Sequence, residues 1–147
     1  MIYLILKHAH SILRWLVLSG IIFVIIRSVS FLINPRTEGK TGQKLVSLTL
    51  SLLHTQVLLG IILYLISPKV IFSAESLSNS FLRFYLVEHI SLMIIAAVLV
   101  TIGVIYSKKV SEPRKIHGRL LIFSLAGLIL IFIAIPWPWR ALGGGWF

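Results

Sequence analysis

The segment FLRFYLVEHISLMIIAAVLVTIGVIY, residues 81–106, is the most informative stretch of the chain. It is apolar over a length that can cross a membrane as a helix. Glu88, near its start, is the only acidic residue inside any apolar segment of the chain, and it stands next to His89. Ionisable side chains are costly in hydrocarbon and are usually kept there for function, facing a partner. The sequence offers His10, Arg14 and His54 as those partners.

The composition is that of a membrane protein. Of the 147 residues, 58% are hydrophobic and only 12% are charged, whereas a water-soluble domain of this size carries far more polar surface. The net charge is +10, but most basic residues stand between apolar segments, which indicates membrane topology rather than nucleic-acid binding. The absence of cysteine excludes disulfides, thiolate metal sites and cysteine-attached haem.

Four apolar segments predict a single transmembrane bundle over residues 1–147. The first is too long and lacks the flanks of a cleavable signal peptide. The last is followed by a Pro- and Trp-rich tail that cannot continue a regular helix and is typical of an interfacial anchor. The expected helices are residues 2–34, 44–67, 81–106 and 116–135, and the tail is residues 136–147.

Basic residues predict the orientation of the bundle. The first and third connections with their flanks contain nine Lys and Arg residues between Arg27 and Arg119, whereas the second has Lys69 and the nearby Arg83. The positive-inside rule therefore places both termini on the periplasmic side of a bacterial inner membrane. Short connections favour an up-down-up-down four-helix bundle, in which the first and third helices are diagonal. Small residues on the helices, such as Gly103 and Gly127, predict close helix packing.

Three of the five histidines fall at membrane depth. At 1.5 Å per residue, His10 lies about 10 Å, His89 about 13 Å and His54 about 20 Å from the outer side. Two imidazoles facing each other at one depth across a bundle are what a bis-histidine b-type haem requires. This favours His10 with His89, and leaves His54 with His89 as the alternative pair. His117 lies at the cytoplasmic boundary, so one haem per chain is expected rather than two.

Charged residues near these histidines suit the propionates of a haem. Arg14, Arg83 and Arg140 all fall toward the outer face, and arginine binds carboxylates in a bidentate manner. Of these, Arg14 and Arg140 are the candidate propionate ligands. Glu88 is expected to neutralise Arg14, to orient a ligand histidine or to accept a proton.

The chain resembles small four-helix membrane proteins catalogued as cytochrome b-like, of the b561 or copper-resistance-D type. The resemblance covers nearly the whole chain and rests on short motifs. It implies a haem-binding redox protein whose ligands are histidines inside helices, namely His10, His54, His89 and, less closely, His117. The motifs are KHAHSILRW at residues 7–15, HTQVLLG at 54–60 with Leu63-Tyr64, EHISLM at 88–93 and IPWPWR at 135–140.

Three functions stay open at this point. The first is a b-type cytochrome that passes electrons between the quinone pool and a periplasmic partner. The second is a transition-metal site or transporter built from His10, His54 and His89, together with Glu88. The third is a haem-free accessory subunit of a larger membrane complex, or a homodimer. No hydrolase or transferase motif is present, and Gly143-Gly144-Gly145 is not followed by a helix that would make it a phosphate-binding loop.

Overall fold

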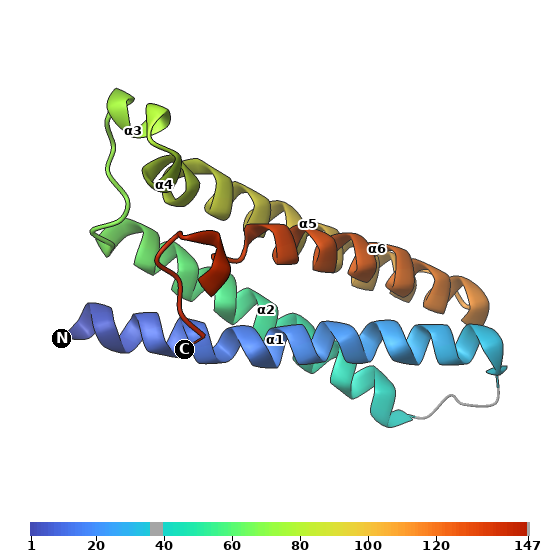
Figure 1. Cartoon of the computed structure of the whole chain (residues 1–147). Coiled ribbons are helices and arrows are strands. Elements are labelled where there is room, and N and C mark those ends of the chain that lie inside the picture. Colours follow the sequence, from blue (N-terminus) through green and yellow to red (C-terminus); the bar gives the residue numbers. More distant parts are fainter. Residues whose placement is uncertain (36–39, 147) are drawn as a thin grey trace.

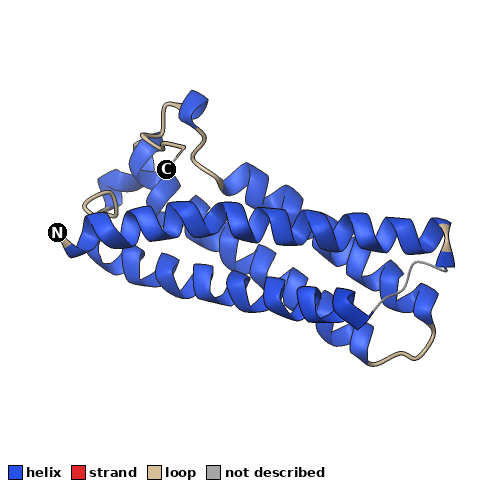
Figure 2. Ribbon diagram, turned by 90° about the horizontal axis from the view of Figure 1, so that it is seen from below, coloured by secondary structure: helices blue, strands red, loops and turns tan. Residues whose placement is uncertain are grey.

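The computed structural model describes residues 1–35 and 40–146, and within these ranges all regular structure is helical. Four helices are long and apolar enough to cross a membrane (Figures 1 and 2). They are α1 (Ile2–Ile33), α2 (Lys40–Ile66), a composite helix over Ser80–Lys108 and α6 (Pro113–Ala134). Pro113 occupies the first turn of α6, where its missing N–H costs nothing, and this helix therefore begins before the position that hydropathy suggested.

The composite helix changes its winding near its start. It comprises α4 (Ser80–Arg83), the π-helical segment η2 (Phe84–Glu88) and α5 (His89–Lys108). The backbone N–H of His89 bonds to the carbonyl of Phe84, five residues earlier. Short α3 (Ala74–Ser78) precedes this helix, and the 3₁₀ turn η3 (Pro138–Arg140) follows α6. Single π turns inside α-helices are frequently found at functional sites.

The long helices pack as a ring of neighbours. α1 packs against α2 and α6, and α5 packs against α2 and α6. The turn between α5 and α6 lies at one end of the molecule, whereas the N-terminus, α3 and α4 lie at the other end (Figure 1). The C-terminal segment folds back from the end of α6 and reaches α1, so it lies at the same end as α3 and α4.

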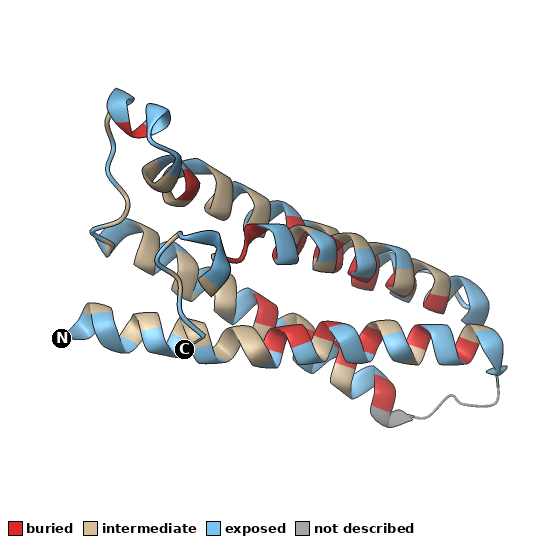
Figure 3. Ribbon diagram, viewed as in Figure 1, coloured by how far each residue is buried: buried red, intermediate tan, exposed pale blue. Residues whose placement is uncertain are grey.

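Buried residues face the inside of the bundle (Figure 3). The outer surface is apolar, with Leu65 72% and Ile122 67% exposed. Such exposure suits a lipid environment, because hydrocarbon tails are as apolar as these side chains. The main core cluster consists of Val17, Leu18, Ile21, Leu53, Ala96, Ala97, Val100, Ile131, Ile135 and Trp137.

The end of α6 lacks backbone donors. Pro136 and Pro138 have no N–H to give to the carbonyls of Phe132 and Ala134, which a continued helix would require. Two side chains donate to these carbonyls instead. The indole N–H of Trp137 donates to Phe132 O at 2.9 Å, and Nδ1 of His89 donates to Ala134 O at 2.7 Å. The protein itself thereby satisfies these carbonyls, as a lipid environment requires.

Close contact between α5 and α6 depends on glycine. A Cβ added at Gly103 of α5 would overlap Cβ of Phe123 on α6, whereas a Cβ added at Gly118 of α6 would meet no atom within 4 Å. We expect Gly103→Ala to lower the free energy of unfolding by about 1–3 kcal/mol, because the two helices must separate to admit the methyl group. Gly118→Ala is the matched control and is expected to be neutral or slightly stabilising. Equilibrium unfolding in mixed detergent micelles measures both, and equal stability of the two variants would contradict this packing.

Candidate functional site

A cavity of about 170 Å³ lies between the helices at the end that carries the chain termini. α1, α2, α5, the end of α6 and the C-terminal segment all contribute to its wall. Its polar lining residues include His10, Arg14, Gln56, Lys69 and His89. Its apolar lining includes Leu53, Val57, Met93, Ile94, Ile131 and Ile135.

His89 is held in one orientation. Because Ala134 O can only accept, the hydrogen bond between it and Nδ1 of His89 places the imidazole proton on Nδ1. The neutral ring then keeps a lone pair on Nε2, which is the atom available to bind a metal. The π turn that begins α5 and the proline-terminated end of α6 together produce this arrangement.

His10 enters the same cavity from α1. Its Nδ1 is buried and has no hydrogen-bond partner among the described residues. The backbone around it is fixed by Gln56, whose Nε2 donates to His10 O at 2.9 Å. A Cβ at Gly60 would lie 3.2 Å from Cε1 of His10, so the absence of a side chain there gives the imidazole its space. His10 of α1 and His89 of α5 therefore line one cavity.

His54 lies elsewhere. It is exposed, its Nε2 bonds to Oγ1 of Thr101 at 3.0 Å, and it lines a separate crevice between α2 and α5. Over residues 1–35 and 40–146, no three histidine or acidic side chains lie close enough to hold a metal ion. The site of three imidazoles that the sequence suggested has no support in this geometry.

His117 is also apart from the cavity. It is fully buried and its ring stacks on Phe31 with 4.1 Å between the ring centroids. Neither His117 nor His54 lines the cavity that contains His10 and His89.

The two candidate arginines are separated. Arg14 lines the cavity and donates from Nη2 to the carbonyls of Gly145 at 3.3 Å and Trp146 at 2.8 Å. Arg140 does not line it. Its Nη1 donates to the carbonyls at the end of α6, Ile133 O and Ile135 O, and its guanidinium lies over the ring of Phe84. Arg140 therefore completes the end of α6.

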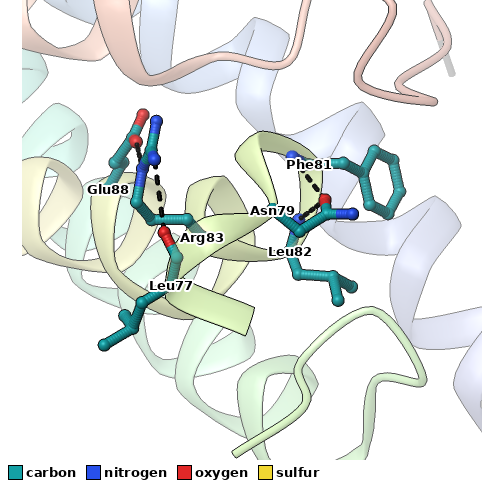
Figure 4. A network of polar contacts seen from close by, with 6 residues as sticks. All are labelled: Leu77, Asn79, Phe81, Leu82, Arg83 and Glu88. Carbon is teal, nitrogen blue, oxygen red and sulfur yellow. Dashed lines mark hydrogen bonds and ion pairs between the residues drawn. The ribbon is translucent and has the colours of Figure 1, made fainter. Parts of the chain in front are cut away.

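Glu88 pairs with Arg83 rather than with Arg14, and it does not line the cavity. Its Oε1 accepts from Nε of Arg83 at 2.8 Å, and Nη1 of Arg83 also donates to Leu77 O (Figure 4). Residues five apart do not meet on a regular α-helix, but a π turn brings them onto one face. The same figure shows Asn79 capping the start of α4 through the N–H groups of Phe81 and Leu82.

Lys7 and Lys69 are cavity residues that sequence reasoning missed. Nζ of Lys69 donates to Gly143 O at 2.9 Å and to the hydroxyl of Tyr85 at 3.1 Å. Burial lowers the pKa of Lys69, and the positive charge of Lys7 lowers it further. Helical spacing places Lys7 on the same face of the first helix as His10, but it was not proposed as a site residue, and no periodicity places a loop residue such as Lys69.

No family profile, curated protein or solved structure matches the chain.

The exposed position of Glu88 predicts a small effect of its removal. Both partners of the Arg83–Glu88 pair are about 40% exposed, with values of 44% and 40%. We expect Glu88→Gln to lower the free energy of unfolding by less than about 1 kcal/mol, as for other exposed ion pairs. Glu112→Gln, which removes the exposed pair with Lys115, is the matched control. A loss several times larger for Glu88→Gln alone, in the same detergent unfolding assay, would show that Glu88 has a buried role.

Proposed function

We propose that the protein binds one haem b and carries electrons in the membrane, with His10 and His89 as its two axial ligands. The observation that supports this proposal is that two imidazoles, one from α1 and one from α5, line one cavity, and each has a nitrogen without a hydrogen-bond partner among the described residues. His89 contributes Nε2, since its Nδ1 proton is committed to Ala134 O. His10 contributes an imidazole whose buried Nδ1 has no partner among the described residues.

The residues present suit this group. Two neutral imidazoles are the usual donors for a low-spin b-type haem iron, and a hydrogen bond to the other ring nitrogen makes the ligand more basic. The bound group would supply a one-electron carrier. Met93, Ile94 and Ile131 line the apolar part of the cavity and would exclude water from it. Arg14 would place positive charge beside the carboxylates of the macrocycle.

The proposed orientation places this site near the periplasmic surface. The cavity lies at the end of the molecule that carries both termini and α3. Basic residues gather at the opposite connections, so the positive-inside rule assigns that opposite end to the cytoplasm of a bacterial inner membrane. The bundle then crosses the membrane in up-down-up-down order. Electrons would come from the quinone pool and leave to a periplasmic partner.

An absorbance spectrum tests the proposed function. The detergent-purified protein from haem-replete cells is expected to show a Soret band and, after dithionite reduction, a sharp α-band, with about one haem per chain by pyridine haemochrome assay. His10→Ala and His89→Ala should each abolish the low-spin spectrum, because each removes one axial ligand.

Two further histidines provide matched controls. His8 is exposed on α1, two residues from His10, and His54 is outside the cavity. His8→Ala and His54→Ala should leave the spectrum unchanged. A colourless wild-type protein would refute the proposed function, and loss of the spectrum in His54→Ala but not in His10→Ala would refute the pairing.

Single cysteines test the orientation, since the native chain has none. Ser78→Cys lies between α2 and α5 and Ser111→Cys lies between α5 and α6, and both positions are exposed. In intact spheroplasts, a membrane-impermeant maleimide is expected to label Ser78→Cys, whereas Ser111→Cys should react only after permeabilisation, because charge asymmetry places that turn inside. The reverse labelling pattern would invert the proposed topology.

A further inference from the structure

The cavity has an uncompensated positive charge. Lys7, Arg14 and Lys69 line it, and no acidic side chain is among its described lining residues. All three cations are partly buried, so their charges are costly unless an anion or several polar groups face them. Nε of Arg14 is buried and has no hydrogen-bond partner among the described residues. Among the described residues, the cavity therefore has three cationic side chains in its wall and no acidic side chain to balance them.

Carbonyl groups of the C-terminal segment accept hydrogen bonds from two of these cations, Arg14 and Lys69. Residues 142–146, which we call the strap, follow η3 and run back to α1 (Figure 1). Lys69 donates to Gly143 O, and Arg14 donates to Gly145 O and Trp146 O. The hydroxyl of Tyr85 donates to Leu142 O at 2.6 Å, and the indole of Trp15 donates to Trp146 O at 3.0 Å. Every one of these contacts uses a strap carbonyl as acceptor.

The strap limits the volume of the cavity. Gly143, Gly144 and Gly145 form part of its wall, and its volume is about 170 Å³. A cavity of roughly 150 Å³ accommodates a ligand about the size of benzene. A porphyrin is larger, and the strap belongs to no helix, so we expect the strap to move when such an amphiphile binds. Movement of the strap would release Arg14 and Lys69 from their carbonyl acceptors.

We propose that the cationic wall of the cavity is a binding site for an amphiphile with two anionic groups, and that these groups replace the strap carbonyls at Arg14 and Lys69. The two cations bind carbonyls of residues only two positions apart, Gly143 and Gly145, which places those acceptors within about 7 Å of each other along the chain. Anionic oxygens form stronger hydrogen bonds with these cations than carbonyls do. Ligand entry and opening of the strap thus occur together, because the anionic groups of the ligand replace the strap carbonyls as hydrogen-bond acceptors.

This inference shares only the cavity with the proposed function. The proposed site requires a ligand with anionic groups, but it does not require that the histidines bind iron. Metal-free protoporphyrin IX and its dimethyl ester are the probes, since they share one macrocycle and differ in two carboxylates. We expect the full-length protein in detergent to bind the dicarboxylate at least about tenfold more tightly than the ester, measured by porphyrin fluorescence.

Substitution of the cationic residues tests which side chains cause the preference for the dicarboxylate over the ester. Lys69→Gln and Arg14→Gln should each reduce it severalfold. Arg83→Gln removes an arginine from the same end of the molecule, but that arginine is paired with Glu88 outside the cavity, so the preference should remain. Lys69 lies outside the long helices, so its variant tests the site even if Arg14→Gln fails to fold. Equal binding of acid and ester by the wild type would overturn the proposal.

The rate of digestion by a carboxypeptidase measures how accessible the strap is. We expect the dicarboxylate to accelerate release of the C-terminal residues severalfold, and the ester to leave it unchanged. A dicarboxylate that saturates the protein without accelerating digestion would overturn the exchange. The same digestion in nanodiscs of phosphatidylcholine, with and without cardiolipin, identifies the source of the two anionic groups, because cardiolipin carries two phosphates. Acceleration by cardiolipin alone would support the exchange with a lipid headgroup as the ligand.

These outcomes are separable from those for haem. A low-spin haem spectrum with equal binding of acid and ester would retain the proposed function and refute the cationic site. A protein that prefers the dicarboxylate but shows no haem spectrum would retain the site and refute the cytochrome.

Discussion

The structure depends on how the carbonyl groups at the end of α6 are satisfied. Two prolines remove the backbone donors, and hydrocarbon offers no water in their place. Trp137, Arg140 and His89 supply the missing hydrogen bonds from their side chains. Because one of these donors is His89 on α5, the requirement that closes α6 also fixes the imidazole that faces the cavity. A feature needed for stability in a membrane thereby sets the protonated nitrogen of a candidate ligand.

Polar side chains in this bundle are of two kinds, which differ in whether their hydrogen-bonding atoms have partners in the protein. One kind is committed to the protein, as in the pairs of His54 with Thr101 and of Glu88 with Arg83. The other kind, His10 and Arg14, retains buried nitrogen atoms without partners among the described residues. The second kind lines a single cavity, and unsatisfied groups in a low-dielectric interior are costly to maintain. Function is therefore better assigned to this cavity than to the carboxylate of Glu88.

Sequence patterns indicated the helices and three of the cavity residues. Hydropathy was sufficient for four apolar helices, and helical spacing with estimated depth selected His10, Arg14 and His89, which line one cavity. The same reasoning assumed regular α-helical winding, so it could not predict that a π turn would pair Glu88 with Arg83. It also could not place Lys69 or the strap, because residues outside periodic elements are positioned by tertiary contacts. Arg140 was assigned to the cavity from proximity in depth, but the unsatisfied carbonyls of its own helix end are nearer.

The cavity lies across the seam between two helical hairpins, α1 with α2 and α5 with α6. The second hairpin is closely packed through Gly103 and Gly127, whereas His10 and His89 stand on opposite sides of the seam. A molecule bound by both imidazoles would act as a cross-link between the hairpins. Its binding free energy would then add directly to the stability of the assembled bundle, since separated hairpins present only half of the site. The lifetime of the folded protein in the membrane would rise with the supply of its ligand, which links abundance to cofactor availability without any dedicated regulator.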